Sequence, residues 1–107
     1  MVGYCASYDY VDALFGEPAH TEFCKPTEAE CREVAARYAQ YHNMQMECVA
    51  SSSMHCYGYE DASRDENCFI TAQECEKARS YDSSDQVDPV LAELGATPVA
   101  KTACARR

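Results

Sequence analysis

The sequence has no tryptophan and very few large aliphatic side chains. Leu, Ile, Val and Phe together contribute 14 of its 107 residues, about 13 %. A content below roughly 20 %, combined with a net charge of −9, is ordinarily typical of disordered chains. A core built from Ala, Tyr and Cys does not easily offset the entropy lost on ordering so many residues. Folding therefore requires another source of stability.

Basic residues are also scarce, with 9 Lys and Arg against 18 Asp and Glu. Nucleic-acid binding relies on clustered Lys and Arg that contact phosphates, and the only basic pair here is Arg106-Arg107. We therefore expect no nucleic-acid partner. No stretch approaches the roughly 18 apolar residues of a membrane-crossing helix, so we also expect no membrane span.

Signatures of catalysis are missing as well. The sequence contains no His-Glu-x2-His, no Gly-x-Ser-x-Gly and no glycine-rich phosphate loop. A cysteine nucleophile needs an unpaired thiol, and an even, duplicated cysteine set leaves none over. We therefore predict that the protein is not an enzyme and binds no cofactor.

What the sequence does have is 8 cysteines, which fall into two sets of four. In each set the second and third cysteines share a Cys-x2-Thr-x2-Glu-Cys motif, at 24–31 and 68–75. The repeated spacing predicts a disulfide framework formed twice, in pseudo-repeats over about 4–48 and 56–104 of a single domain, 1–107. The two sets are Cys5, Cys24, Cys31 and Cys48, and Cys56, Cys68, Cys75 and Cys104.

Four disulfides would stabilise the fold by roughly 2–4 kcal/mol each. Disulfides persist in oxidising compartments, which predicts a secreted, extracellular or periplasmic protein. No signal peptide opens the sequence, so we expect a mature form of an exported chain. The competing expectation is a reduced intracellular helical protein with free or zinc-bound thiols.

Four cysteines in one unit can pair in three ways. The motif places one cysteine three residues before the expected helix cap and the other at the fourth helical position, which favours a local bridge. The other two schemes stay open, because sequence does not fix connectivity. The local scheme gives Cys24–Cys31 and Cys68–Cys75, with Cys5–Cys48 and Cys56–Cys104 closing the units.

Each unit is predicted to contain a strand, a second strand and a helix. Alternating tyrosine and cysteine predicts strands over 4–11 and 56–59, the second followed by a returning strand over 68–70. Thr-x2-Glu capping boxes start helices over 28–42, with an extension to Cys48 left open, and over 72–80. Asp88-Pro89 starts a short helix that ends at Gly95, and 99–104 is expected as a strand. The fold class is a small, disulfide-rich α+β fold with two tandem strand-strand-helix pseudo-repeats.

The 8 tyrosines suggest a recognition role. Tyrosine gives rigid contact area with a polar tip, although most of those on strands should simply cover the sheet. We predict a binding or structural module, such as a subunit of a larger extracellular assembly, with a protease inhibitor or a secreted effector as alternatives. Contact with a protein partner, or self-assembly, is expected through one or two of Tyr4, Tyr8, Tyr10, Tyr57 and Tyr59.

Soft-metal binding is the main chemical alternative. The region 44–56 gathers sulfur and imidazole groups that suit Cu(I) or Zn, but it contains no Cys-x2-Cys knuckle. Our first prediction is therefore that the protein has no metal site and that the methionines fill gaps in the core. The ligands of the alternative are Met44, Met46, Cys48, His55 and Cys56.

Overall fold

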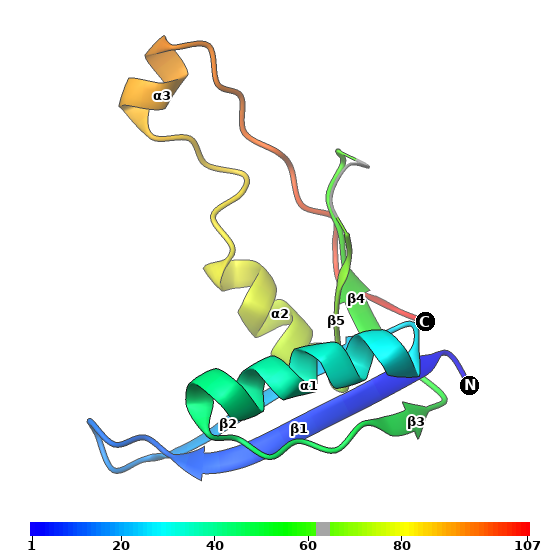
Figure 1. Ribbon diagram of the computed structural model, residues 1–107. Coiled ribbons are helices and arrows are strands. Elements are labelled where there is room, and N and C mark those ends of the chain that lie inside the picture. The colour runs from blue at the N-terminus through cyan, green and yellow to red at the C-terminus, as the bar shows by residue number, and fades with distance from the viewer. Residues whose placement is uncertain (62–64) are drawn as a thin grey trace.

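The computed structural model describes residues 1–61 and 65–107, so part of the connection between the strands predicted over 56–59 and 68–70 lies outside the described residues. The small, disulfide-rich α+β fold is confirmed. Figure 1 shows the elements in chain order: β1 (Gly3–Val11), β2 (Pro18–Lys25), α1 (Glu28–His42), β3 (Val49–Ser51), β4 (His55–Tyr57), β5 (Asn67–Phe69), α2 (Ala72–Tyr81), α3 (Pro89–Glu93) and β6 (Ala105–Arg106).

The strands form one antiparallel sheet in the order β3-β1-β2-β5-β4-β6. The long β1–β2 hairpin and the short β4–β5 hairpin meet at a single residue pair, Cys24 with Cys68. Helix α1 packs along β1 and β2, and α2 packs against β4 and β5 (Figure 1). Each hairpin therefore carries its own helix, and the sheet joins the two.

The helix starts follow the predicted caps. Thr27 and Thr71 each accept a hydrogen bond through the side chain from the backbone N–H three residues on, at 3.2 Å in both cases. Helix α1 ends at His42 and is capped by Asn43, whose φ of 54° is left-handed, so the helix does not continue to Cys48. The strand expected over 99–104 is wrong: that range contains only an isolated bridge between Lys101 and Tyr59, and β6 begins after it, at Ala105.

The disulfides are Cys5–Cys24, Cys31–Cys48, Cys56–Cys68 and Cys75–Cys104. The predicted local bridges are therefore wrong. Cys24 points to one face of the sheet, while its neighbour Phe23 packs with Cys31 of α1 on the other face. Since the sheet lies between them, Cys24 and Cys31 cannot bond. The same pairing order occurs in both halves of the chain; their origin as a duplication stays a prediction.

Two small buried clusters replace a conventional core. On one face, the two cross-strand disulfides pack side by side with Met54. On the other face, Ala6 and Phe23 of the sheet pack against Cys31 and Ala35 of α1, and the Phe23 ring stacks on Tyr38 at 5.7 Å between centroids. Sulfur thus supplies much of the buried volume that leucine and isoleucine supply in other domains.

Two segments extend away from these clusters. The radius of gyration is 15.6 Å, against about 13 Å for a compact chain of this length. The far end of the β1–β2 hairpin projects on one side, and residues 83–100, with α3 at their tip, form a separate arm (Figure 1). No helix within 1–61 or 65–107 has the length and apolar character needed to cross a membrane.

Candidate functional site

Two of the candidate contact tyrosines, Tyr57 and Tyr59, are hydrogen-bonded to the end of α2. Tyr57 is 4 % exposed, and its ring stacks on Phe69 at 6.4 Å. The hydroxyls of Tyr57 and Tyr59 both donate to Asp82 Oδ2, at 3.0 and 2.6 Å, and Asn67 donates to the Tyr59 hydroxyl. The contact predicted for Tyr57 is therefore corrected: its side chain is buried beneath the end of α2.

This tyrosine–aspartate cluster has a fixed protonation state. Hydrogen bonding from Tyr59 holds the pKa of Asp82 well below its usual range, and burial raises the pKa of Tyr57 above its ordinary value. At neutral pH Asp82 is thus ionised and both hydroxyls are protonated donors. The cluster anchors the C-terminal end of α2 to β4.

The other three candidates lie along one side of β1. Tyr4 packs against the Ala6–Phe23 cluster, whereas Tyr8 and Tyr10 are half-buried and stack on each other at 6.5 Å. They continue toward the end of the hairpin, where the chain turns between β1 and β2. Tyr8 and Tyr10 therefore lie next to the exposed end of the hairpin.

The end of this hairpin is apolar and exposed. Leu14 is 88 % exposed and Phe15 is 76 % exposed, and Val11 precedes them on β1. The turn is nevertheless ordered, because Asp12 Oδ1 accepts hydrogen bonds from the backbone N–H groups of Leu14 and Phe15 at 2.8 and 3.3 Å. The name hairpin tip is used below for Val11, Leu14 and Phe15.

The two cysteines of the alternative soft-metal site are both in disulfides. Cys48 and Cys56 are bonded to Cys31 and Cys68, so neither can ligate a metal as a thiolate. Met46 packs at the α1 cluster. Within the described parts of the chain, no group of three or more His, Cys, Asp or Glu side chains is arranged to hold a metal ion.

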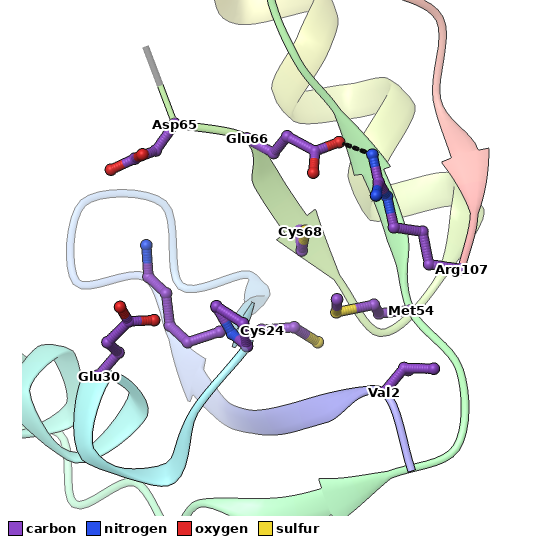
Figure 2. A pocket seen from close by; sticks show the side chains of 10 residues that line it. Val2, Cys24, Glu30, Met54, Asp65, Glu66, Cys68 and Arg107 are labelled. Atoms are coloured by element: carbon purple, nitrogen blue, oxygen red, sulfur yellow. Dashed lines mark hydrogen bonds and ion pairs between the residues drawn. The ribbon is translucent and has the colours of Figure 1, made fainter. Parts of the chain in front are cut away.

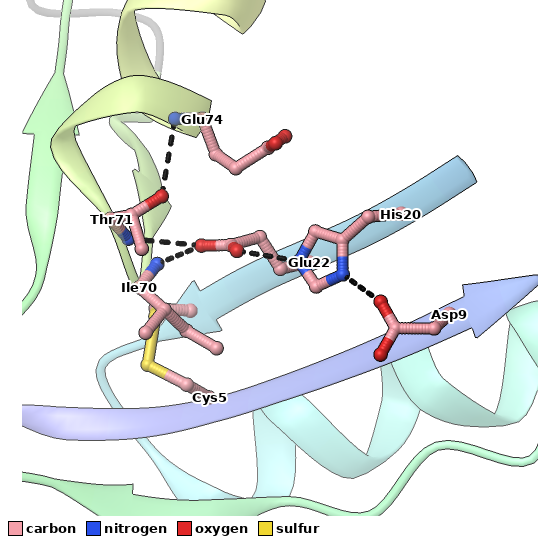
Figure 3. Close-up of polar contacts among 8 residues, drawn as sticks. Cys5, Asp9, His20, Glu22, Ile70, Thr71 and Glu74 are labelled. Atoms are coloured by element: carbon pink, nitrogen blue, oxygen red, sulfur yellow. Dashed lines mark hydrogen bonds and ion pairs between the residues drawn. A yellow bond between two sulfur atoms is a disulfide. The ribbon is translucent and has the colours of Figure 1, made fainter. Parts of the chain in front are cut away.

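A chain of polar side chains crosses the β1–β2 hairpin and reaches α2 (Figure 3). His20 Nδ1 lies 2.5 Å from Asp9 Oδ1, and His20 Nε2 lies 2.7 Å from Glu22 Oε1. The other Glu22 oxygen accepts hydrogen bonds from the backbone N–H groups of Ile70 and Thr71, at 2.5 and 3.0 Å. Glu22 is 6 % exposed, so this carboxylate is buried between the two hairpins.

The geometry favours a charged imidazole. An ionised carboxylate only accepts hydrogen bonds, and a neutral imidazole has one N–H, so both contacts are satisfied only by imidazolium. Hydrogen bonding to Asp9 and then to Glu22 raises the pKa of His20 above its ordinary value. Sequence reasoning missed this cluster, because Asp9 lies opposite His20 only in the observed register of β1 and β2, which the sequence alone does not determine. The available signal was the spacing of His20 and Glu22, which are two residues apart and so lie on the same face of a strand.

Stability should accordingly fall at alkaline pH. The folded pKa of His20 is raised, so its contribution is fully present below about pH 6.5 and is lost as pH rises through the folded value. Because His20 is partly exposed, we expect the free energy of unfolding to fall by up to about 1 kcal/mol. Urea unfolding at mildly acidic and at alkaline pH measures this difference in the free energy of unfolding. His20→Asn should remove the difference, whereas His42→Asn, on the exposed end of α1, should leave it unchanged. An unchanged pH profile in the His20 variant would refute the assignment.

A separate recess lies between the hairpins (Figure 2). It has a volume of about 510 Å³ and lies beside the row of cross-strand disulfides. Arg107 forms an ion pair with Glu66 at its edge, and Lys25, Glu30 and Asp65 add further charge. Ligand pockets are mostly apolar with a few polar groups. Half of this lining is charged, with two cations and three carboxylates beside five apolar residues, so it is more polar than a typical ligand pocket.

Comparison with known proteins gives no further guide: no family model, curated protein or solved structure matches this chain.

Proposed function

We propose that this protein is a non-catalytic, exported module that binds a protein partner through its β1–β2 hairpin. The observation that carries the proposal is the hairpin tip, where Val11, Leu14 and Phe15 are exposed together on an ordered turn. A cluster of exposed apolar side chains often marks an interaction site, whereas single exposed apolar residues are common anywhere on a protein surface. Tyr8 and Tyr10 supply aromatic area beside the tip.

The rigidity of the hairpin supports a binding role. The disulfide Cys5–Cys24 closes its base, eight residue pairs join β1 and β2, and Asp12 fixes the turn. A surface that is ordered before it meets its partner loses less entropy on binding. The same framework supports export, because all eight cysteines are bonded and such bridges persist in oxidising compartments.

Replacement of the apolar tip tests the proposal. A photo-crosslinking amino acid at position 15 should capture a specific protein from the native source, and the purified pair should bind. We expect Leu14→Asp with Phe15→Asp to weaken this binding by at least about 100-fold, since two apolar anchors each contribute about 1.5–3 kcal/mol. Thermal unfolding should change little, because neither side chain is packed.

The matched control is Leu94→Asp on the arm, an apolar side chain that is exposed to a similar degree. It should leave affinity unchanged. If Leu94→Asp abolishes binding while the tip variant binds normally, the contact surface is the arm and the hairpin proposal is wrong.

A further inference from the structure

One edge of the sheet is only partly covered. Strand β1 extends from Gly3 to Val11, but β3 pairs with it only at residues 3–5. Because β3 is the end of the sheet order, nothing within the described chain pairs as a strand with the outer side of β1 beyond Cys5. This remaining part, residues 7–11, is called the free edge below.

The disulfide fixes which backbone groups face outward. Cys5 and Cys24 lie directly opposite each other with their Cα atoms 4.1 Å apart, a separation typical of a pair that is not hydrogen-bonded. Alternation then directs the N–H and C=O groups of Ser7, Asp9 and Val11 away from β2. No backbone hydrogen bond from another described segment reaches these three residues. The free edge is therefore a row of solvent-exposed backbone donors and acceptors that no strand of the described chain pairs with.

The start of this edge opens into a recess. It has a volume of about 480 Å³ and lies where β3 stops, beside Ser7 and between the sheet and the segment that leads into β3. Gln45 and Glu47 belong to its lining. An added strand along Ser7–Val11 would therefore continue the line of β3, with one end in this recess.

A second copy of this chain is a poor occupant. The antiparallel register that pairs the whole free edge with itself places Asp9 opposite Asp9, and like charges directly opposite are destabilising. Each chain also carries a net charge of −9. Asp9 shares the His20 imidazolium with Glu22, so these three side chains together keep one negative charge, and Glu47 is exposed nearby. The charge of the edge therefore favours a cation.

We propose that the free edge of β1 binds an extended segment of a partner protein by strand addition, and that this segment alternates basic and apolar residues. A Lys or Arg of the segment would lie opposite Asp9, and its neighbours would lie on the face of Tyr8 and Tyr10. Backbone hydrogen bonds to Ser7, Asp9 and Val11 provide the affinity, and the alternation provides the specificity. This inference rests on the proposed function and names the partner class for the same hairpin.

Amide exchange in the free protein gives the first test. The amides of Ala6, Tyr8 and Tyr10, which face β2, should be protected, and those of Ser7, Asp9 and Val11 should exchange freely. Protection of the second set would mean that the edge is already covered and would overturn the proposal.

A peptide gives the second test. The probe is acetyl-Thr-Val-Lys-Val-Lys-Val-Thr-amide, and binding should add protection and shift the NMR signals at Ser7, Asp9 and Val11. The matched control is the same peptide N-methylated on alternate residues, which removes its edge hydrogen bonds and should weaken binding by more than about tenfold. Equal binding of both peptides, binding mapped to another surface, or no binding would each reject strand addition.

Protein variants separate this result from the hairpin proposal. Ser7→Pro removes one outward donor and leaves the β2 ladder intact, so it should weaken the probe by about tenfold. Asp9→Asn should reduce the preference for the Lys peptide over the same peptide with both Lys residues replaced by Glu. Leu14→Asp with Phe15→Asp should not change the affinity for the short probe peptide. If this variant alone loses binding to the native partner, the proposed function of the hairpin tip stands. Strand addition is then decided separately by the exchange and peptide data on the free edge.

Discussion

Reduction of the four disulfides is expected to unfold this protein completely at neutral pH and 25 °C. The four bonded loops follow one another along the chain without overlap, with separations of 19, 17, 12 and 29 residues. Independent loops make their entropic contributions roughly additive. Each loop of this size is worth about 3 kcal/mol, so the four together contribute about 12 kcal/mol, as much as the whole stability of an ordinary domain.

The remaining interactions cannot replace that contribution. Within residues 1–61 and 65–107, the buried apolar side chains other than cysteine are those of Ala6, Phe23, Ala35, Met54 and Tyr57. Circular dichroism and urea titration before and after reduction measure the effect: the oxidised protein should unfold cooperatively and the reduced protein should show no transition. The control is the oxidised protein carried through the same treatment without reductant. A cooperative transition in the reduced, alkylated chain would contradict this account of its stability.

The helices could be predicted because their signals are local. The Thr27 and Thr71 caps sit within a few residues of the groups they satisfy, so the helix starts follow from the sequence. Asp88, Pro89 and Gly95 bound α3 in the same way. The strands β3 and β6, of three and two residues, carry no such signal and form only because a longer strand lies beside them.

The disulfide pairing could not be predicted because it depends on sheet faces. Cys24 and Cys31 are close in sequence, yet β2 and α1 direct their side chains to opposite sides of the sheet. Likewise, the alternation around Tyr57 predicted a strand but not which of its faces α2 would cover. The sequence shows that Val11, Leu14 and Phe15 are apolar, but their exposure together at the hairpin tip required the structure.

Replacement of Glu22 by alanine is expected to separate the behaviour of the two halves. The hairpins share one residue pair in the sheet, Cys24 with Cys68, and Glu22 adds hydrogen bonds from Ile70 and Thr71 at the start of α2. Hydrogen bonds to a charged group contribute about 1.5–3 kcal/mol, and a buried N–H left without an acceptor costs more than a solvated one. We expect Glu22→Ala to lower the free energy of unfolding by about 3 kcal/mol.

The distribution of the loss is as informative as its size. Without Glu22, the N–H groups of Ile70 and Thr71 lose their acceptor and His20 keeps only Asp9, so protection from hydrogen exchange should fall more over 72–81 than over 28–42. Glu22→Gln retains a carbonyl acceptor for α2 but cannot accept from His20 as a carboxylate does, and should lie between the two. Glu76→Ala, on the exposed side of α2, is the control and should change stability by less than about 0.5 kcal/mol. If the Glu22→Ala protein instead loses protection equally over both helices, the halves unfold as one unit and the sheet pairing alone couples them, which would support the prediction of a single domain over 1–107.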